Sequence, residues 1–447
     1  MSKSVKVKKG LKLPFKGEAE KKLEVAPLSK TYSVKPPNFY SVVPKMVLKE
    51  GARVQAGDEL FFSKYSDKTR FVSPVSGVLK EVVRGAKRRI LEVIIEADAQ
   101  IDYKDFGSLS ASSASAEDVK TKVFASGLGA FFKQRPYDVI ADADDTPKAI
   151  YVSAYNTAPL VADLEFVLKD RMEFFQEGIE VLNKLTEGRV YLGVDAGTTS
   201  ALKEVKDAEI LNVSGPHPAG NIGTLVHETE PINSGERVWS VGAEDVAIIG
   251  ELFETGRFNA ERTVAVTGQS AQERKYYKTL IGAQVGSFVK AFDDNSRFIS
   301  GDVLTGEKIE SDGHMSFYDN ELTIIPEGDT YRMFGWVPFM DNHVHSMSRT
   351  SLSWLFPNKK YDINTNLNGE ERSLVVTGEM EEVMPLDIFP MHLIKACMAG
   401  DVEKMENLGI YEVIPEDFAL IDYINTSKVE AQQVIRNGLD IMITEVG

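Results

Sequence analysis

The pattern of apolar and polar positions changes its period twice along the chain. From residue 32 to residue 97, short runs rich in β-branched and aromatic residues alternate with turns, as in YSVKPP, DELFF and RRILEVIIEA. Gly51, Gly57 and Gly77 stand where tight turns need a positive backbone φ. The pattern therefore predicts a small unit built of short β-strands.

After this region the period alternates between that of strands and that of helices. Residues 149–153, 189–194 and 209–213 are short apolar runs typical of buried strands. Between the first two, residues 163–186 repeat apolar positions at helical spacing and predict one long helix with an apolar face. Strands separated by helices predict a parallel or mixed sheet with helices packed on it.

The last third of the chain is mixed. A helix is expected over 243–255, ended by Gly256 as a C′ residue. Residues 262–266 are expected to form a strand and residues 284–304 short β elements. From residue 384 the pattern becomes helical, most clearly over 392–398 and 427–442.

These changes divide the chain into four expected parts of an α/β multidomain protein. The sequence GSLSASSASA at 107–116 is rich in Ser and Ala and marks a boundary. The expected parts are an N-terminal segment with the β unit (1–102), an α/β domain (103–257), a small β module (258–330) and a largely helical C-terminal region (331–447).

Composition indicates a folded protein without a membrane span. Of 447 residues, 43% are apolar and 26% charged, and no apolar stretch approaches the ~20 residues that cross a bilayer. The basic start lacks the apolar core of a secretory signal, so a cytoplasmic location is expected. Because Cys397 is the single cysteine, an intrachain disulfide and a cysteine-ligated zinc or iron–sulfur centre are excluded.

Charge is distributed unevenly. Residues 1–90 carry 21 Lys+Arg against 8 Asp+Glu, a net +13, which leaves −29 of the total of −16 for residues 91–447. The basic head could face anionic lipid or an acidic partner, or the two parts could dock on each other. Nucleic acid is not expected as a partner, because the acidic body repels phosphate and no stacking aromatic motif accompanies the basic residues.

Three short motifs suggest chemistry when taken alone. GVDAGTTS at 193–200 is similar to the first phosphate loop of actin-like sugar kinases, but helical sequence follows it and no second phosphate loop supports it. Asp341, His343 and His345 suggest a metal, yet a full ligand set is not evident, and no metal is expected. SGPHPAGNIGT at 214–224 follows an expected strand, at the end where α/β proteins bind ligands.

Taken together, longer pieces resemble one family over nearly the whole chain. The pieces, in order, are KGLKLP (9–14), the KEGARVQAGDEL and SPVSGVL runs of the β unit, SGLGAFFKQRPY (126–137), SGPHPAGNIGT, ERVWSVG (236–242) and EVMPLDIFP (382–390). They resemble the A subunit of the bacterial Na+-translocating NADH:quinone oxidoreductase. That family is related to the electron-transport protein RnfC and to the NADH- and flavin-binding subunit of complex I.

The resemblance implies a fold for each part of the chain. Residues 1–102 would contain a barrel-sandwich hybrid of the biotinyl/lipoyl type, in which Lys64 and Lys68 lie outside the sequence setting of a carrier lysine. A Rossmann-like α/β domain, a β-grasp (SLBB-like) module and a helical domain would follow. In the complex I relative, that helical domain carries a four-cysteine cluster.

Departures from the complex I relative predict that the flavin-binding loop and the cysteine ligands of the iron–sulfur cluster are lost. Its glycine-rich flavin loop corresponds to 126–132, where Gly127 and Gly129 are the only glycines and bulky residues would obstruct approach to phosphate. At the cluster position, residues 420–428 contain no cysteine. The chain is therefore expected to bind no cofactor, while other subunits handle NADH, flavins, an iron–sulfur cluster and quinone.

The resemblance thus implies a peripheral subunit on the cytoplasmic face of the inner membrane, with other subunits, some membrane-embedded, as partners. The whole complex would oxidise NADH, reduce quinone and pump Na+, while the isolated chain would not be catalytic. A quinone contact is a second hypothesis, because a quinone pocket needs apolar walls and a hydrogen-bond donor. Its candidate residues are Phe131, Phe132, His217, Gly215 and Gly220. A ligand-free adaptor and an active NADH/flavin dehydrogenase subunit remain alternatives, with a sugar kinase as a remote one.

Overall fold

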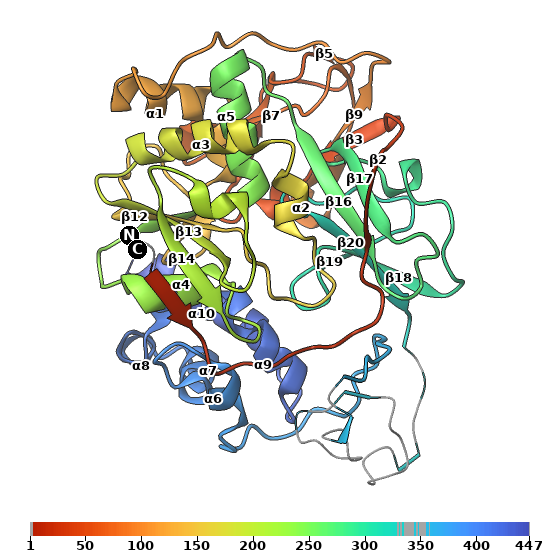
Figure 1. The fold of residues 1–447 in the computed structure, drawn as a ribbon, viewed down its shortest axis with the longest axis vertical. Coiled ribbons are helices and arrows are strands. Elements are labelled where there is room, and N and C mark those ends of the chain that lie inside the picture. Colours follow the sequence, from red (N-terminus) through yellow and green to blue (C-terminus); the bar gives the residue numbers. More distant parts are fainter. Residues whose placement is uncertain are drawn as a thin grey trace.

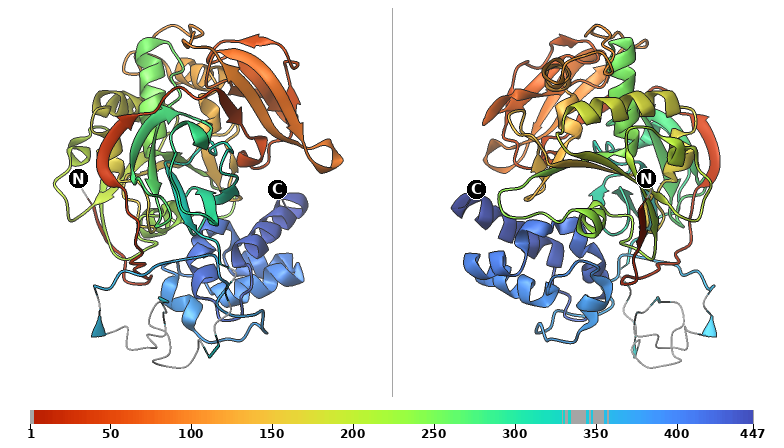
Figure 2. Two further views of the ribbon diagram at one scale, coloured as in Figure 1. Left: turned by 90° about the vertical axis from the view of Figure 1, so that its right-hand side faces the viewer. Right: turned by 60° about the vertical axis from the view of Figure 1, so that its left-hand side comes forward.

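A computed structural model describes residues 3–328, 330, 333–334, 344–345, 347, 355–356 and 358–446. The β unit lies at one end of the molecule and the C-terminal helices at the other (Figures 1 and 2). Two sheets, β3-β9-β8-β5 and β4-β6-β7, form the β unit, here called the barrel. Its strands are β3 (Thr31–Val34), β4 (Pro44–Met46), β5 (Arg53–Val54), β6 (Glu59–Ser63), β7 (Ser66–Val72), β8 (Gly77–Arg84) and β9 (Ile90–Ala97), with 3-10 turns η1 (Pro36–Asn38) and η2 (Ala86–Arg88). Gly51 and Gly57 have φ of 86° and 97°, as their turns require.

A seven-stranded sheet of order β1-β14-β13-β12-β15-β10-β11 forms the α/β unit. From β1 to β15 all neighbours are parallel, and β10 is antiparallel to β15. Its strands are β1 (Lys3–Lys6), β10 (Lys133–Arg135), β11 (Val139–Ile140), β12 (Ala149–Ser153), β13 (Arg189–Asp195), β14 (Glu209–Ser214) and β15 (Val238–Gly242). Its helices are α1 (Ala116–Ala125), η3 (Leu128–Phe131), α2 (Leu164–Leu168), α3 (Met172–Lys184), η4 (Ala201–Glu204), α4 (Ile222–Thr229) and α5 (Ala243–Thr255).

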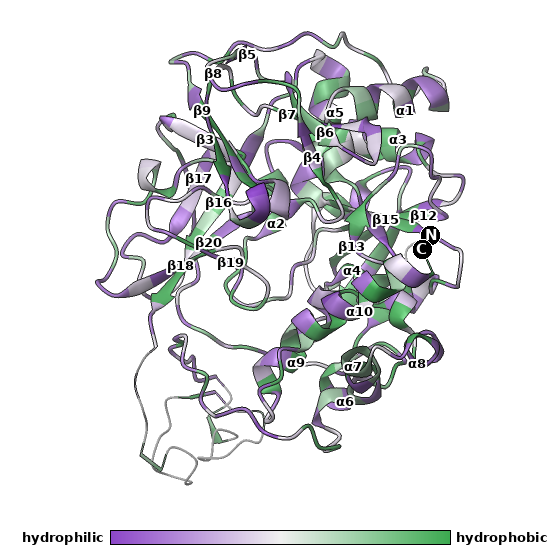
Figure 3. Ribbon diagram, turned by 180° about the vertical axis from the view of Figure 1, so that it is seen from behind, coloured by the Kyte–Doolittle hydropathy of each residue, from purple (hydrophilic) through white to green (hydrophobic). Residues whose placement is uncertain are grey.

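Alternation along β12 explains how this sheet is covered. Ile150 and Val152 belong to the large core shared with α3 and α5, whereas Tyr151 points to the opposite face, which Leu225 of α4 covers. The strands and α5 are mostly hydrophobic, consistent with this burial (Figure 3). The predicted strands at 149–153, 189–194 and 209–213 and the helix ending at Gly256 are confirmed.

The long helix predicted over 163–186 is wrong in its middle, because α2 ends at Leu168 and α3 begins at Met172. The two pieces pack on different parts of the molecule. Val167 of α2 clusters with Tyr276 of the six-stranded sheet, while Phe175 of α3 lies in the core under α5. One straight helix could not satisfy both contacts, although the apolar spacing is continuous in the sequence.

A six-stranded sheet of order β19-β18-β20-β16-β17-β2 forms the third unit. Its elements are β2 (Glu20–Val25), β16 (Glu261–Thr267), β17 (Lys275–Leu280), β18 (Ser296–Ser300), β19 (Glu307–Ile309), β20 (Glu321–Pro326) and the turn η5 (Val285–Ser287). One hydrophobic core runs without a break from the barrel through the α/β unit into this sheet. These three units therefore form a single packed body.

The C-terminal helices have a separate core that includes Leu393, Phe418 and Leu439. They are α6 (Glu379–Val383), α7 (Pro390–Ala399), α8 (Val402–Asn407), η7 (Ile410–Glu412), η8 (Pro415–Phe418), α9 (Ala419–Ile424) and α10 (Ala431–Glu445). The predicted helices near 392–398 and 427–442 correspond to α7 and α10.

The N-terminal segment, which the sequence groups with the barrel, pairs with two other sheets. β1 lies beside β14 of the α/β unit, and β2 forms the outer strand of the six-stranded sheet beside β17. Between them the chain passes the C-terminal region, where Gly10 N–H donates to the Glu382 carbonyl oxygen (3.1 Å). In Figure 1 this segment is drawn in dark red, and β1 and β2 are joined by an irregular stretch.

Candidate functional site

The carboxyl edge of the parallel strands is the position where α/β folds bind ligands. Here the loop between β14 and α4 is closely packed by its own chain. A Cβ atom on Gly215 would lie 2.5 Å from the Val7 carbonyl oxygen, and one on Gly220 would lie 1.8 Å from the Tyr155 carbonyl oxygen. Both glycines are therefore required by backbone packing, whatever else the loop does.

His217 is buried in this loop. Its Nδ1 lies 3.2 Å from Thr157 Oγ1, and its carbonyl oxygen accepts from Leu11 N–H (2.9 Å), which ties the loop to the N-terminal segment. Burial lowers the pKa of His217 to about 4, so the ring is neutral at physiological pH. A neutral imidazole offers one N–H donor and one acceptor.

Phe131 and Phe132 lie on the far side of the sheet from His217. They precede β10 and belong to the large core, whereas the loop that carries His217 packs against residues that follow β12. Both rings are buried: Phe131 lies 5.1 Å from Phe317, and Phe132 lies 5.5 Å from Trp239, measured between ring centroids. The five residues suggested for quinone thus form two groups, and their contact with quinone stays a prediction.

The shortened glycine loop is filled by side chains. Gly127 has a left-handed φ of 84°, and a Cβ there would lie 2.6 Å from the methyl groups of Val72 in β7. A Cβ on Gly129 would lie 2.6 Å from the Phe124 ring. Side chains of Val72 and Phe124 therefore pack directly against both glycines, which argues against close approach of a flavin phosphate to this loop.

A buried ion pair lies where α4 begins. Arg135, in β10, donates to both carboxylate oxygens of Asp417 (2.7 and 3.4 Å), and both side chains are nearly inaccessible to solvent. Asp417 also accepts from Ile414 N–H (2.9 Å). A Cβ on Gly223, in the first turn of α4, would lie 2.2 Å from Asp417 Oδ1, so the C-terminal region places its own anion at this helix end.

A second buried network lies at the start of α5. Arg262 of β16 donates to Asp245 Oδ1 (2.6 Å), while Glu244 accepts from Thr263 N–H (2.9 Å). Burial raises the pKa of Asp245 and of Glu244, and the Arg262 guanidinium opposes that rise. The network joins the α/β unit to the six-stranded sheet. Neither buried network was predicted, because no local spacing relates residues so far apart in the sequence.

The kinase-like loop forms a turn between a strand and a 3-10 helix. Gly197 N–H donates to Asp195 Oδ1 (2.8 Å), and Lys203 of η4 donates to the carbonyl oxygens of Ala196 (3.3 Å) and Thr198. The lysine thus binds the loop itself.

Of the three residues suggested as metal ligands, the structure describes His345, because Asp341 and His343 lie outside the described residues. The Nδ1 of His345 lies 3.0 Å from Tyr423 Oη, and its ring packs edge-on to Phe15 and Tyr361. Among the residues that the structure describes, no group of three or more His, Cys, Asp or Glu could hold a metal ion.

The segment at the cluster position, 420–428, is held by hydrogen bonds. Asp422 accepts from Ala431 N–H (2.5 Å) and Gln432 N–H (3.3 Å) at the start of α10, and Asn425 donates to the Val429 carbonyl oxygen (2.9 Å). Cys397 lies on α7, where burial raises its pKa to about 12, so it remains a thiol.

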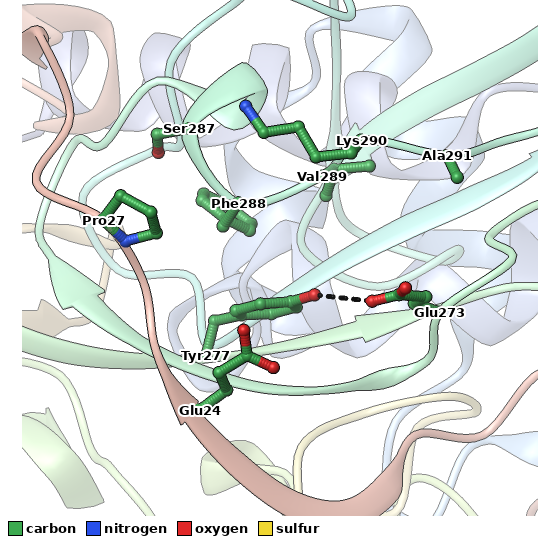
Figure 4. Close-up of a pocket in the computed structure, with 9 residues that line it drawn as sticks. All are labelled: Glu24, Pro27, Glu273, Tyr277, Ser287, Phe288, Val289, Lys290 and Ala291. Atoms are coloured by element: carbon green, nitrogen blue, oxygen red, sulfur yellow. Dashed lines mark hydrogen bonds between the residues drawn. The ribbon is translucent and has the colours of Figure 1, made fainter.

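A small surface pocket of about 180 Å³ lies away from the sheet edge, beside the six-stranded sheet. Its floor is Tyr277, with Glu24 of β2 and Glu273 at its sides and Phe288 and Lys290 opposite (Figure 4). This volume is below the ~300 Å³ at which ligand pockets usually begin. In the part of the chain that the structure describes, no helix is long and apolar enough to span a membrane.

Three of the four expected parts of the chain match models of known protein families. The NqrA N-terminal barrel-sandwich hybrid domain matches residues 5–98, and the NqrA second alpha/beta domain matches residues 114–258. A further match, described as the NQRA C-terminal domain, covers residues 263–311. These ranges correspond to the barrel, the α/β unit and most of the six-stranded sheet.

Curated relatives match the chain from end to end. The A subunit of the Na(+)-translocating NADH-quinone reductase from Neisseria meningitidis serogroup B is 34% identical over 99% of this chain and 100% of its own length. Proteins of the same name from Marinomonas sp. and Yersinia pestis bv. Antiqua are 32% and 33% identical, covering 98% and 97% of this chain and 99% and 98% of their own. The chain therefore belongs to the NqrA family, the A subunit of the Na(+)-translocating NADH-quinone reductase.

Proposed function

We propose that this chain is a peripheral subunit of a Na+-translocating NADH-quinone reductase, binds no redox cofactor and acts by holding other subunits in place. The observation that carries the proposal is the filled glycine loop, where Val72 and Phe124 occupy the space above Gly127 and Gly129. The cysteine-free segment around Asp422, held by its own hydrogen bonds, gives independent support. The electron path from NADH to quinone then belongs to partner subunits.

Two finer fold assignments belong to the same proposal. We interpret the seven-stranded sheet as Rossmann-like, because its parallel strands follow the order β14-β13-β12-β15, as in half of a doubly wound sheet. We interpret the six-stranded sheet as a β-grasp (SLBB-like) module, supported by the antiparallel pair β16–β17 beside the parallel pair β16–β20.

The proposed docking end of the molecule is the barrel, which carries 12 of the 21 basic residues of the head, while the other nine lie on the N-terminal segment beside other units. Residues 1–90 carry the net +13, and the barrel that contains most of them lies opposite the acidic C-terminal helices (Figure 2). A basic surface is attracted to acidic loops and to the anionic cytoplasmic leaflet. In this proposal the barrel faces the membrane-embedded subunits and the chain lies on the cytoplasmic face of the membrane.

Contact with quinone is the second candidate function, and one observation favours it. His217 is neutral and buried at the carboxyl edge of the sheet, so it can bond a quinone carbonyl without charge. Its partners would be Gly215 and Gly220 of the same loop, since Phe131 and Phe132 are fully buried in the large core. Titration of the full chain with a short-chain quinone tests this: saturable fluorescence quenching that His217→Ala abolishes is expected, and no saturable change would exclude it.

Reconstitution tests the main proposal. Purified chain should show no flavin absorbance and should restore NADH-quinone reductase activity when added to a complex that lacks this subunit. Reversing the charge of exposed lysines of the head should prevent that restoration, while the same number of reversals among exposed lysines outside residues 1–90 should not. Flavin absorbance of the purified chain, or full restoration by the head variant, would contradict the proposal.

A further inference from the structure

The turn between β8 and β9 concentrates positive charge. Arg84, Lys87, Arg88 and Arg89 fall within six residues, all four are exposed, and none of the ion pairs of the described residues includes them. Several cations elsewhere in or next to the barrel have carboxylate partners, as in Lys30–Glu96, Arg53–Asp98 and Arg70–Glu59. The charge of this turn is therefore left available for an external partner.

The backbone conformation of the turn is energetically unfavourable for the residues that occupy it. Lys87 and Arg88 both have left-handed φ values, 53° and 60°, and Arg89 N–H donates to the Ala86 carbonyl oxygen (3.2 Å). Tight hairpin turns with two such residues normally carry Asn-Gly, because bulky side chains are disfavoured in this conformation. Two long basic side chains at these positions lower the stability of the fold, and strained residues of this kind are common at functional sites.

An apolar side chain accompanies the cations. Leu91, at the start of β9, is 37% exposed, and a Cβ on Gly85 would lie 2.9 Å from its Cδ1 atom. Arg84 donates to the Arg88 carbonyl oxygen (3.3 Å), which holds these two cations beside each other. The turn thus presents a cationic cluster with one exposed leucine at its base, a combination that suits the boundary between headgroups and acyl chains.

We propose that the β8–β9 turn binds the anionic headgroup surface of a lipid bilayer. This inference rests on the proposed function, for which it names the partner of one part of the basic head. Lipid is favoured over an acidic protein loop because laterally mobile headgroups can neutralise flexible, unpaired side chains without a preformed pocket. Each basic residue near an anionic membrane changes the partition coefficient by about fivefold, so four cations supply a substantial interaction.

Sedimentation of the full chain with vesicles tests the inference. Vesicles of phosphatidylcholine with phosphatidylglycerol should bind it, vesicles of phosphatidylcholine alone should not, and added salt should release it. The variant Lys87→Asn/Arg88→Gly should bind about 25-fold more weakly, since two cations are lost. Its melting temperature should be unchanged or higher, because Asn-Gly suits the turn. A loss of binding therefore could not be attributed to misfolding.

The matched control removes equal charge elsewhere in the basic head. Lys8→Gln/Lys9→Gln changes two exposed lysines of the N-terminal segment and should leave vesicle binding within about twofold of wild type, since screening limits distant charges. Equal losses in the two double variants would overturn the proposal, because they would show that binding depends only on net charge.

Failure of the lipid inference and failure of the proposed function give different results. If wild-type chain ignores anionic vesicles yet restores activity to the depleted complex, the turn contacts a protein and the lipid inference is overturned, while the proposed function stands. If the chain binds anionic vesicles through this turn but does not restore activity, the proposed function is overturned and the lipid inference is supported.

Discussion

The barrel and the C-terminal helices both contact the α/β unit, but through different interactions. At the barrel, aromatic rings continue across the boundary: Phe39 lies 4.4 Å from Phe71 of the barrel and 4.9 Å from Phe317, between ring centroids. Phe317 precedes β20 and lies 5.1 Å from Phe131 of the α/β unit. At the C-terminal helices, buried ion pairs accompany apolar contacts such as Tyr137 against Tyr411. Arg135 binds Asp417, and other charged groups surround that pair.

Helix α10 adds a second polar contact. The Arg436 guanidinium donates to the Tyr137 carbonyl oxygen (2.7 Å) and stacks 3.5 Å from the Tyr40 ring centroid of the barrel. An apolar boundary of this kind is insensitive to pH and makes units unfold together, whereas a polar boundary depends on geometry and protonation. The body should therefore behave as one cooperative unit, and the C-terminal helices as a separately attached one.

The largest expected effect comes from the apolar boundary. Phe39→Ala should lower the free energy of unfolding of the whole body by about 4 kcal/mol, because a fully buried ring is removed where three units meet. Urea denaturation should show one transition at a lower midpoint. Phe292→Ala, at a partly exposed ring, is the control and should have a much smaller effect. A separate barrel transition in the Phe39 variant would contradict a continuous core.

Next in size is the loss of the buried ion pair. Arg135→Ala should weaken attachment of the C-terminal helices by about 3 kcal/mol, because it leaves the Asp417 carboxylate buried without its partner. Hydrogen exchange across 379–446 should increase while exchange in the body does not. The double variant Arg135→Met/Asp417→Leu should recover much of the loss. Equal protection in the single variant and the wild type would show that the attachment does not depend on the pair.

A smaller effect is expected from pH. Glu412 raises the pKa of His227, their side chains lying 3.6 Å apart, and burial together with Asp417 raises the pKa of Glu416 to about 7. Both groups bind protons more tightly in the attached state, so attachment weakens as pH rises. The contribution of Glu416 to attachment is lost as pH rises from its ordinary pKa of 4.5 to about 7. The contribution of His227 is lost as pH rises through its raised pKa.

Hydrogen exchange of the C-terminal helices at pH 5 and pH 8 measures this change after correction for the intrinsic rate. His227→Gln/Glu416→Gln should flatten the dependence, because neither replacement titrates in that range. Attachment that strengthens with rising pH in the wild type would contradict the assignment.

The smallest effect should come from the exposed ion pair between the barrel and the α/β unit. Lys68 Nζ lies 2.6 Å from Asp144 Oδ2, and both side chains are more than half exposed. Lys68→Ala should leave the urea midpoint unchanged within error, since solvent and salt screen such pairs. A loss comparable to that of Phe39→Ala would mean that the barrel boundary is ionic after all.

Local periodicity was enough to predict β12, β13, β14 and α5, because each keeps one face against the same core over its whole length. It failed between α2 and α3, where the apolar pattern continues although the packing partner changes. The filled glycine loop could be anticipated from the bulky residues around Gly127.

The buried networks could not be anticipated in the same way. Arg135 and Asp417 are separated by 282 residues, and nothing in the neighbourhood of either specifies the other. Asp417 also looks like an ordinary acid in the most acidic part of the chain. Only the tertiary fold shows that it is a buried anion at the start of α4.

The N-terminal segment has a consequence for how the chain is made. Lys3 pairs with Leu211 and Glu20 pairs with Lys275, so these residues must wait for partners synthesised much later. At about 5–20 residues per second, the strand beside β14 waits roughly 10–40 s. During that interval the residues before the barrel remain unpaired and available to a chaperone. Strands β1 and β2 are thus made before the barrel but complete their sheets only after it.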